Sequence, residues 1–247
     1  MKYAIIAAGE GSRLAKEGLN DPKPLVRVAG ECLIDRLLRI FTDNDAEEIV
    51  VICREGEGAD DPMVRVRKHL EQIEKEGLNG KHIPLRFIVK NTPSSMHSMF
   101  ELSSMVQDSK FIATTVDTIF NEQDFASYVK TFATSDVDAL MGVTDYIDDE
   151  KPLYVAIDDE LHITGFLDAD PDKQCRYISG GIYGLTPVCV ETLQHCIESG
   201  QSRMRNFQRN LVSDGLRLSA HPFSKVLDID HVTDIAKAEE FLTTTKK

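Results

Sequence analysis

The chain has 247 residues with 28 basic and 41 acidic side chains, and its net charge of −13 excludes an extended nucleic-acid-binding surface, which needs clustered Lys and Arg. With 42% hydrophobic and 28% charged residues, the composition is typical of a globular protein rather than a disordered or fibrous one. A chain of this length can bury a substantial core, and we expect one domain over residues 1–247.

The first residues and the cysteines bear on location. The N-terminal stretch MKYAIIAAGEGSR has only a short apolar run before charged residues, so we expect neither a signal peptide nor a membrane partner. The cysteine count is five, an odd number, and no pair has CxxC spacing, which indicates reduced thiols rather than a disulfide framework. We therefore expect a cytoplasmic protein.

Apolar segments alternate with amphipathic ones through the first half of the chain. Strands are expected at 3–8, 48–53, 84–90 and 110–116, and helices after Gly30, before residue 84 and from about His97. This alternation is typical of crossover connections around a parallel sheet. We therefore predict an α/β fold with a Rossmann-like, open, mainly parallel sheet flanked by helices.

The pattern changes in the second half. A strand at 137–144 precedes two short apolar segments joined by the acidic turn at 158–160, which predicts an antiparallel hairpin. A strand at 177–185, helices from Pro187 and over 203–213, a strand at 226–229 and a final helix complete the chain. We expect a small antiparallel insertion in this half.

The most specific motif is AAGEGSRL at 7–14, directly after the first strand. Gly9 and Gly11 permit a tight turn that presents backbone amides, and Arg13 adds a permanent positive charge, so the loop is suited to phosphate oxygens. It is neither the dinucleotide fingerprint, which needs Gly where Leu14 stands, nor a Walker loop, which needs GK[ST]. Taken alone, a Gly-x-Gly pair is equally typical of a plain strand-to-helix turn.

Another basic group follows ten residues after Arg13. Lys23 lies between Pro22 and Pro24, whose rings restrict the backbone on both sides. Together, AAGEGSRL and PKPLVRVAG resemble the signature of the sugar-1-phosphate nucleotidyltransferase (NDP-sugar pyrophosphorylase) family, GxG[ST]RL followed by PKPL. The resemblance implies that the nucleotide is bound by Ala8, Gly9, Gly11, Ser12 and Arg13. It also implies catalytic roles for Arg13 and Lys23, which we expect in a solvent-facing loop system.

Two later segments extend the resemblance and imply a Mg²⁺ site. TTVDTIF at 114–120 is similar to the family's strand-end segment with a metal-binding aspartate, here Asp117, although Val116 stands where Gly is usual. A carboxylate at the end of a parallel strand faces the ligand crevice and suits a hard cation. VLDIDHVTDIAKAEEF at 226–241 is similar to the segment with the second ligand, which is Asp228 or Asp230. The alternative role for Asp230 is to cap the last helix.

YISGGIYGL at 177–185 resembles the segment of the family that lines the sugar pocket. It implies acceptor-binding roles for Gly180, Gly181 and Tyr183, because paired glycines expose the backbone to a hydroxylated ligand. The acidic-Lys-Pro segment usual before this strand is replaced by FLDADPDK at 166–173. Lys173 is therefore the candidate substitute for its phosphate-binding lysine.

The segment NTPSSMHSMFEL at 91–102 lies where the family binds base and ribose. Ser98 offers a hydroxyl that could cap the following helix and face the nucleotide. The segment lacks the GTA-type run of glucose-phosphate enzymes and is more similar to phosphocholine cytidylyltransferases. His97 is not assigned a catalytic role, because an ionised phosphate needs no general base.

The resemblance implies transfer of NMP from an NTP to a sugar-1-phosphate, which forms an NDP-sugar and pyrophosphate with Mg²⁺ as cofactor. The nucleotide-binding part is expected at about 1–135 and the acceptor-binding part at about 136–225. Two alternatives stay open. One is cytidylyl transfer to phosphocholine or another small phosphomonoester, and the other is an inactive nucleotide-binding relative.

Overall fold

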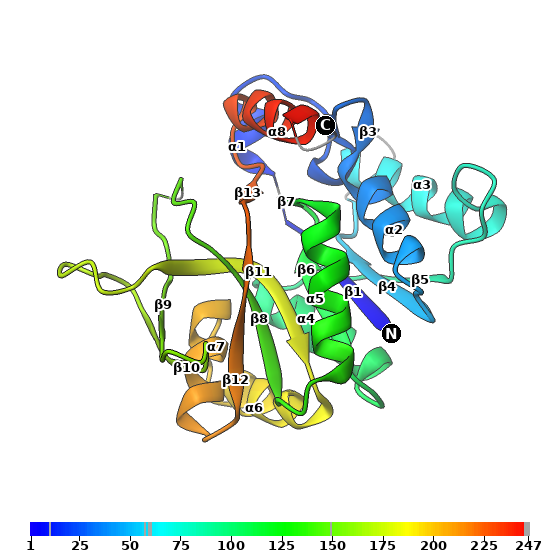
Figure 1. The fold of residues 1–247 in the computed structure, drawn as a ribbon. Coiled ribbons are helices and arrows are strands. Elements are labelled where there is room, and N and C mark those ends of the chain that lie inside the picture. The colour runs from blue at the N-terminus through cyan, green and yellow to red at the C-terminus, as the bar shows by residue number, and fades with distance from the viewer. Residues whose placement is uncertain (10, 57, 59–60, 149, 245–247) are drawn as a thin grey trace.

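The computed structural model describes residues 1–9, 11–56, 58, 61–148 and 150–244 (Figure 1). The strands are β1 (Lys2–Ala7), β2 (Arg27–Val28), β3 (Glu31–Cys32), β4 (Glu48–Cys53), β5 (Leu85–Val89), β6 (Phe111–Thr115), β7 (Thr118–Phe120), β8 (Ala139–Thr144), β9 (Tyr154–Ile157), β10 (Ile163–Leu167), β11 (Tyr177–Leu185), β12 (Leu218–Phe223) and β13 (Val226–Asp228). The helices are α1 (Ser12–Lys16), η1 (Lys23–Leu25, a 3₁₀ turn), α2 (Leu33–Asp43), α3 (Pro62–Glu76), α4 (Ser95–Val106), α5 (Glu122–Thr134), α6 (Pro187–Glu198), α7 (Met204–Ser213) and α8 (Val232–Thr244).

One sheet of nine strands runs through the molecule in the order β10-β9-β11-β6-β1-β4-β5, with β8 paired to β11 and β12 paired to β8. Strands β6, β1, β4 and β5 are parallel to their neighbours in this group, as are β8 and β12. Strand β11 runs antiparallel to β6, β8 and β9, and β9 forms the predicted hairpin with β10. The predicted α/β fold with a mostly parallel central sheet flanked by helices is confirmed.

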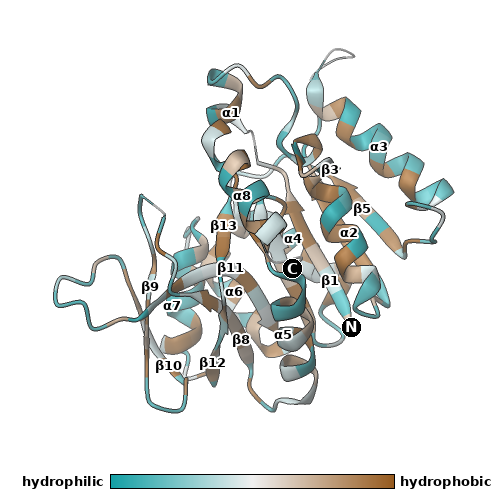
Figure 2. Ribbon diagram, turned by 45° about the horizontal axis from the view of Figure 1, so that its top comes forward, coloured by the Kyte–Doolittle hydropathy of each residue, from teal (hydrophilic) through white to brown (hydrophobic). Residues whose placement is uncertain are grey.

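The alternation of side chains along β1 shows how the core is divided. Tyr3, Ile5 and Ala7 pack on one face with residues of α2, α3 and α5, whereas Ala4 and Ile6 pack on the other face with residues of α4, α6 and α7. Figure 2 shows hydrophobic strands between helices whose outer faces are hydrophilic. Helices on both faces explain why β1 is continuously apolar rather than alternating.

Besides the short strands β2, β3 and β7, two longer elements were not expected from the sequence. Strand β12 contains His221 and Pro222, which interrupt an apolar pattern, but proline is compatible with a strand at the edge of a sheet. Helix α5 is capped by Asn121, whose side chain accepts hydrogen bonds from the backbone N–H groups of Gln123 and Asp124 at 2.7 and 3.2 Å. Helix α4 begins at Ser95, two residues before the expected start.

A two-stranded ribbon brings distant parts of the sequence together at the carboxyl end of β6. Strand β7 pairs antiparallel with β13, with Asp228 opposite Thr118. The backbone N–H of Ile229 donates to the carbonyl of Asp117 at 3.1 Å. The buried side chain of Arg36 also holds β7 in place, because its guanidinium donates a hydrogen bond to the carbonyl of Phe120 at 3.1 Å. The two aspartate segments therefore meet although more than one hundred residues separate them.

The last described helix, α8, lies beside α1 (Figure 1). The carboxylate of Glu17 accepts hydrogen bonds from the Val232 backbone N–H at 2.7 Å and contacts His231 Nδ1 at 2.5 Å. In the described part of the chain, every helix is too short or too polar to cross a membrane. All five cysteines are free thiols.

Candidate functional site

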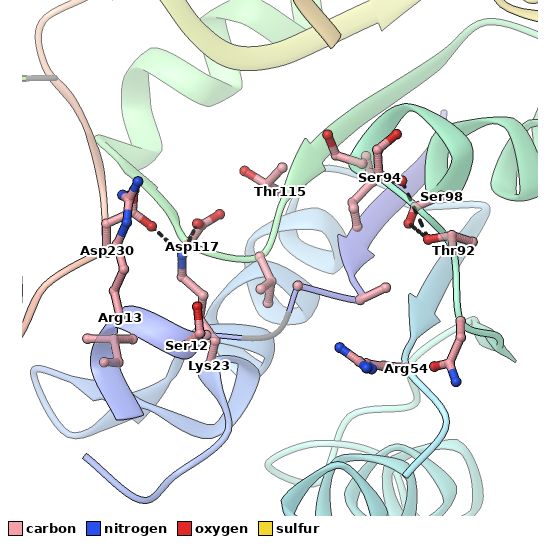
Figure 3. A pocket seen from close by; sticks show the side chains of 18 of the residues that line it. Ser12, Arg13, Lys23, Arg54, Thr92, Ser94, Ser98, Thr115, Asp117 and Asp230 are labelled. Atoms are coloured by element: carbon pink, nitrogen blue, oxygen red, sulfur yellow. Dashed lines mark hydrogen bonds and ion pairs between the residues drawn. The ribbon is translucent and has the colours of Figure 1, made fainter. Parts of the chain in front are cut away.

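A cavity of about 610 Å³ opens at the carboxyl ends of β1, β4 and β6; we call it the β1 cavity (Figure 3). Its lining includes these predicted site residues: Ala8, Gly9, Gly11, Ser12, Arg13, Lys23, Ser98, Asp117 and Asp230. Figure 3 shows Arg13, Lys23 and the two aspartates on one side of the cavity, with Arg54 and Thr92 on the other. The fold thus brings together all the residues assigned to the nucleotide.

Gly11 is required by both conformation and packing. Its φ of 59° lies in the left-handed region, which glycine adopts without strain. A Cβ at Gly11 would lie 3.3 Å from the Cβ of Lys23, so the glycine also lets the two loops approach. The glycine-rich loop and the lysine segment therefore form one wall of the β1 cavity.

Lys23 is the centre of a charged cluster. Its ammonium group makes ion pairs with Asp117 and with Asp230, the latter at 2.8 Å, and Arg13 Nη1 lies 2.8 Å from the other oxygen of Asp230. Burial disfavours the charged ammonium, but the two carboxylates outweigh it and raise the pKa of Lys23. Burial also acts against the charge of Asp230, yet Lys23 and Arg13 lower its pKa. Lys23 and Asp230 therefore both stay charged near neutral pH.

The expected position of Lys23 is wrong in one respect. Its side chain is only 11% exposed, whereas that of Arg13 is 56% exposed. The two residues do not belong to one solvent-facing loop system, because Lys23 is enclosed by the carboxylates that it binds.

Asp228 differs from the other two aspartates. It lines neighbouring cavities rather than the β1 cavity, and it faces the crevice rather than the core. Desolvation by the crevice walls and the charge of Asp117 raise the pKa of Asp228, against the opposing charge of Lys23. Asp228 is therefore less disposed than Asp117 and Asp230 to carry a negative charge.

These carboxylates fit a magnesium ion held by two protein ligands. Within the described ranges, no group of three or more His, Cys, Asp or Glu side chains is arranged to hold a metal. Asp117 and Asp230, however, both form ion pairs with the ammonium group of Lys23, so a carboxylate oxygen of each residue points toward the same cation. Mg²⁺ is commonly bound by one or two carboxylates and completed by substrate phosphates and water. The donor set therefore suits Mg²⁺ together with a nucleotide.

Asp230 does not cap α8. Its side chain is engaged by Arg13 and Lys23, and the first turn of α8 is instead bonded by Glu17 and Asp234. The capping alternative for Asp230 is therefore wrong.

The expected capping role of Ser98 is wrong as well. The cap of α4 is Ser94, whose hydroxyl accepts from the backbone N–H of His97 at 3.4 Å. Ser98 lies within the helix, 1% exposed, and its Oγ is 2.6 Å from Thr92 Oγ1. It still lines the β1 cavity, where the hydroxyl pair faces the space beside Arg54 (Figure 3).

Sequence reasoning missed several residues that line the β1 cavity. They are Arg54, Asn91, Thr92 and Thr115. Each lies at or just after the carboxyl end of a parallel strand, which is where ligands bind in such sheets. That position in the predicted strands was the available signal.

Two further cavities adjoin the β1 cavity beyond the aspartates. One of about 340 Å³, the Lys237 cavity, shares Arg13 and Asp230 with the β1 cavity and is also lined by Gly180. The other, of about 520 Å³, is called the Arg203 cavity and is lined by Gly181 and Tyr183. The structure thus places Gly180, Gly181 and Tyr183, three of the four predicted acceptor residues, next to the charged cluster.

The two glycines of β11 serve different purposes. Gly181 has a φ of 70° and lies where the pairing of β11 with β8 shifts between Ser179 and Ile182, so its conformation forms a bulge. Gly180 is packed tightly, because a Cβ would lie 3.2 Å from the carbonyl of Gly142. Only Gly181 faces the Arg203 cavity.

The structure does not bring Lys173 to these three cavities. The residue is exposed in a turn with a φ of 52°, and its backbone N–H donates to the carbonyl of Asp170 at 3.2 Å. Lys151 lines the Lys237 and Arg203 cavities instead. It belongs to the sequence Glu150–Lys151–Pro152, an acidic-Lys-Pro segment that lies before β9 rather than directly before β11. The sequence therefore contains the acidic-Lys-Pro motif, but not directly before β11, where it was expected.

Comparison with known proteins decides the family. A family model described as nucleotidyl transferase matches residues 2–245. The chain belongs to the nucleotidyl transferase family. The bifunctional protein GlmU of Alkaliphilus metalliredigens is 23% identical over 252 aligned residues, covering 98% of this chain and 52% of GlmU. The chain thus spans about half the length of this curated relative.

Two solved structures share the fold. The inositol-1-phosphate CTP transferase from T. maritima superimposes with a TM-score of 0.79 and 20% identity, covering 100% of this chain and 96% of that one. A UDP-glucose pyrophosphorylase complexed with UDP-glucose gives a TM-score of 0.75 and 14% identity, covering 100% and 99%. The fold of the whole chain is therefore that of nucleotidyltransferases.

Proposed function

We propose that this chain transfers NMP from an NTP to a sugar-1-phosphate and releases pyrophosphate. The proposal depends on one observation: the β1 cavity, with its glycine-rich loop and basic groups, shares Arg13 and Asp230 with a neighbouring cavity. Two ligands bound on either side would meet at this charged cluster. The names of the related proteins, which act on inositol-1-phosphate with CTP or bind UDP-glucose, support the same chemistry.

The reaction requires positioning and charge neutralisation. An oxygen of the acceptor phosphate forms a bond to the α-phosphorus, and the bond from that phosphorus to the bridging oxygen of pyrophosphate breaks in line. Lys23 would contact the α-phosphate and Arg13 the leaving pyrophosphate, where negative charge develops. Asp117 and Asp230 would hold Mg²⁺, which neutralises phosphate charge when it is bound. No proton transfer is needed, because the attacking phosphate is ionised.

A phosphocholine acceptor is less compatible with the site. A quaternary ammonium group is bound by an aromatic cage, and the tyrosines of β9 and β11 available to form one are Tyr154, Tyr177 and Tyr183. In the pairing of β9 with β11, Tyr177 lies opposite Val155 and Ile178 lies opposite Tyr154. Because successive side chains of a strand point to opposite faces, the rings of Tyr154 and Tyr177 lie on opposite faces of the sheet. The Arg203 cavity is also lined by Lys151, Arg203 and Arg205, which repel a cation.

The deciding experiment measures pyrophosphate release with each of the common NTPs against a panel of sugar-1-phosphates, inositol 1-phosphate and phosphocholine. We expect turnover with one NTP and a sugar-1-phosphate or its polyol analogue. Turnover with phosphocholine alone would show that the acceptor is phosphocholine and not a sugar-1-phosphate. Binding of a nucleotide without turnover on any acceptor would identify the chain as an inactive relative. Arg13→Gln is the matched control, because its effect separates turnover at this site from a contaminating activity.

A further inference from the structure

The Arg203 cavity has an unusual charge for this protein. It lies between β11, the segment before β9 and the first turn of α7. Its cationic lining residues are Lys151, Arg203 and Arg205, and Asp228 is the only acidic side chain among the described residues that line it. In a chain with a net charge of −13, three basic groups around one cavity are a local reversal of sign. The cavity therefore favours an anionic ligand.

Helix α7 opens on this cavity with an uncapped N-terminus. The helix has ten residues, and its N-cap position is Arg203, which makes no side-chain cap hydrogen bond. Ser, Thr, Asp and Asn are the residues that normally satisfy the first backbone N–H groups of a helix. Here these donors and the positive end of the helix dipole lie beside Ser202, Met204 and Arg205, which line the cavity. An anion bound there would take the place of a cap.

Arg203 itself has no internal counter-ion. Among the described residues, it is the only arginine whose side chain makes no hydrogen bond or ion pair. Arg205, next but one in the chain, is paired with Asp168, and Arg209 on the next turn binds the same carboxylate. The guanidinium of Arg203 is thus left at the cavity with its five donors unused.

Gln208 adds an independent indication of a ligand. The residue is 2% exposed and lines the cavity. Its carboxamide oxygen accepts a hydrogen bond from Ser179 Oγ at 2.9 Å, whereas within the described ranges its amide nitrogen has no partner. The amide nitrogen is thus a free donor at the cavity, where an acceptor atom of a ligand can bind it. Gln208 therefore provides a donor next to the basic helix terminus.

We propose that the acceptor carries a second anionic group, a carboxylate or a second phosphate, which binds to Arg203, the N-terminus of α7 and Gln208. This inference rests on the proposed function. The reacting phosphate is assigned to the other end of the cavity, because Lys151 lines both this cavity and the Lys237 cavity, which contains Arg13 and Asp230. The substrate class is then an acidic sugar phosphate rather than a neutral sugar carrying a single phosphate.

The test compares three ligands by isothermal titration calorimetry on the full chain. They are glucose 1-phosphate, glucuronic acid 1-phosphate and glucose 1,6-bisphosphate. We expect at least one of the two ligands with a second anionic group to bind at least tenfold more tightly than glucose 1-phosphate. Arg203→Gln should remove this gain and leave the affinity for glucose 1-phosphate within twofold. The matched control is Lys173→Gln, which removes an exposed cation outside the cavity and should keep the gain.

Two results would overturn the inference. One is that neither ligand with two anionic groups binds more tightly than glucose 1-phosphate. The other is that Arg203→Gln weakens all three ligands by the same factor, which would assign Arg203 to the reacting phosphate. Failure of the proposed function has a different signature: the calorimetric gain remains but no NTP yields pyrophosphate with any acceptor.

Discussion

At the scale of single residues, the site depends on one enclosed ammonium group. Lys23 neutralises two carboxylates that otherwise repel each other and any incoming triphosphate. Arg13 acts on the same cluster from the solvent side, because its guanidinium is more than half exposed. Removing the charge of Lys23 should therefore destabilise the folded protein more than removing the charge of Arg13.

We predict that Lys23→Met and Arg13→Gln both lower turnover by at least about 100-fold, the effect of removing one preorganised charge at developing negative charge. Only Lys23→Met should destabilise the fold strongly, by about 3–5 kcal/mol, because it leaves Asp117 enclosed without its counter-ion. Arg13→Gln should cost less than about 1 kcal/mol. Urea unfolding and steady-state kinetics measure both effects. Wild-type turnover in a folded Lys23→Met variant would remove the lysine from the mechanism.

The choice between Asp228 and Asp230 as the second metal ligand leads to another prediction. Asp230→Asn should reduce by at least tenfold the gain in NTP affinity that Mg²⁺ provides, and NTP binding without metal should become no weaker, since a repulsive charge is lost. Asp228→Asn is the matched control, because the raised pKa of Asp228 makes neutral asparagine a close mimic. Calorimetry with and without Mg²⁺ measures the gain. If only Asp228→Asn lost the increase in NTP affinity with Mg²⁺, Asp228 and not Asp230 would be the second metal ligand.

The residues of the site differ in how predictable they were from sequence. Gly11, Arg13 and Lys23 lie within a short motif, so their proximity follows from adjacency in the chain. Lys151 and Arg203 belong to separate segments whose meeting depends on how β11, β9 and α7 pack. No local pattern distinguishes such residues from exposed basic side chains, because their partners are set by tertiary structure.

At the scale of elements, the bulge in β11 is the feature that shapes the acceptor side. Gly181 adopts its positive φ where the register with β8 shifts, and its carbonyl accepts a hydrogen bond from Thr114 Oγ1 at 3.1 Å. A side chain here would meet ordinary contacts only, with Thr118 Oγ1 at 3.6 Å from the added Cβ. The fold tolerates the added atom, whereas the bound acceptor would encounter it.

We predict that Gly181→Ala costs about 1–2 kcal/mol, the strain of a left-handed alanine, and raises the KM for the acceptor severalfold with a smaller change in kcat. The matched control is Gly215→Ala, where φ is 76° and a Cβ would meet no atom within 4 Å. This control should show the same loss of stability in urea unfolding and an unchanged KM. An equal KM in both variants would mean that Gly181 has only a structural role.

The elements missed from sequence show what pattern reasoning lacks. In β12, the interruption by His221 and Pro222 is tolerated only because the strand lies at the edge of the sheet, and edge position is a property of the assembled sheet. For α5, the signal was present in the chain, since Asn121 precedes buried Phe125, Tyr128 and Phe132 at helical spacing. Strand β12 was therefore missed because its edge position is set only by the assembled sheet. Helix α5 could have been predicted from the sequence.

At the scale of the whole molecule, the two parts of the chain that we propose to bind the nucleotide and the acceptor are built on one sheet. Strand β11 of the second part pairs with β6 of the first along four residue pairs. Each of the two cores also combines both parts: Leu140 and Ile182 pack in the cluster that contains Tyr3, and Met141 in the one that contains Ala4. A boundary near residue 135 therefore crosses hydrogen-bonded strands and both cores.

From this continuity we predict that the chain unfolds as one cooperative unit, although its length exceeds the range in which two-state behaviour is usual. Differential scanning calorimetry should show one transition whose calorimetric and van 't Hoff enthalpies agree. Because a ligand stabilises the whole unit that binds it, saturating NTP should raise that single transition without splitting it. Arg54→Gln, which removes a basic group from the lining of the β1 cavity, should retain a single transition but reduce the shift with NTP. Two transitions, with NTP raising only one of them, would show instead that the parts before and after residue 135 are separate domains.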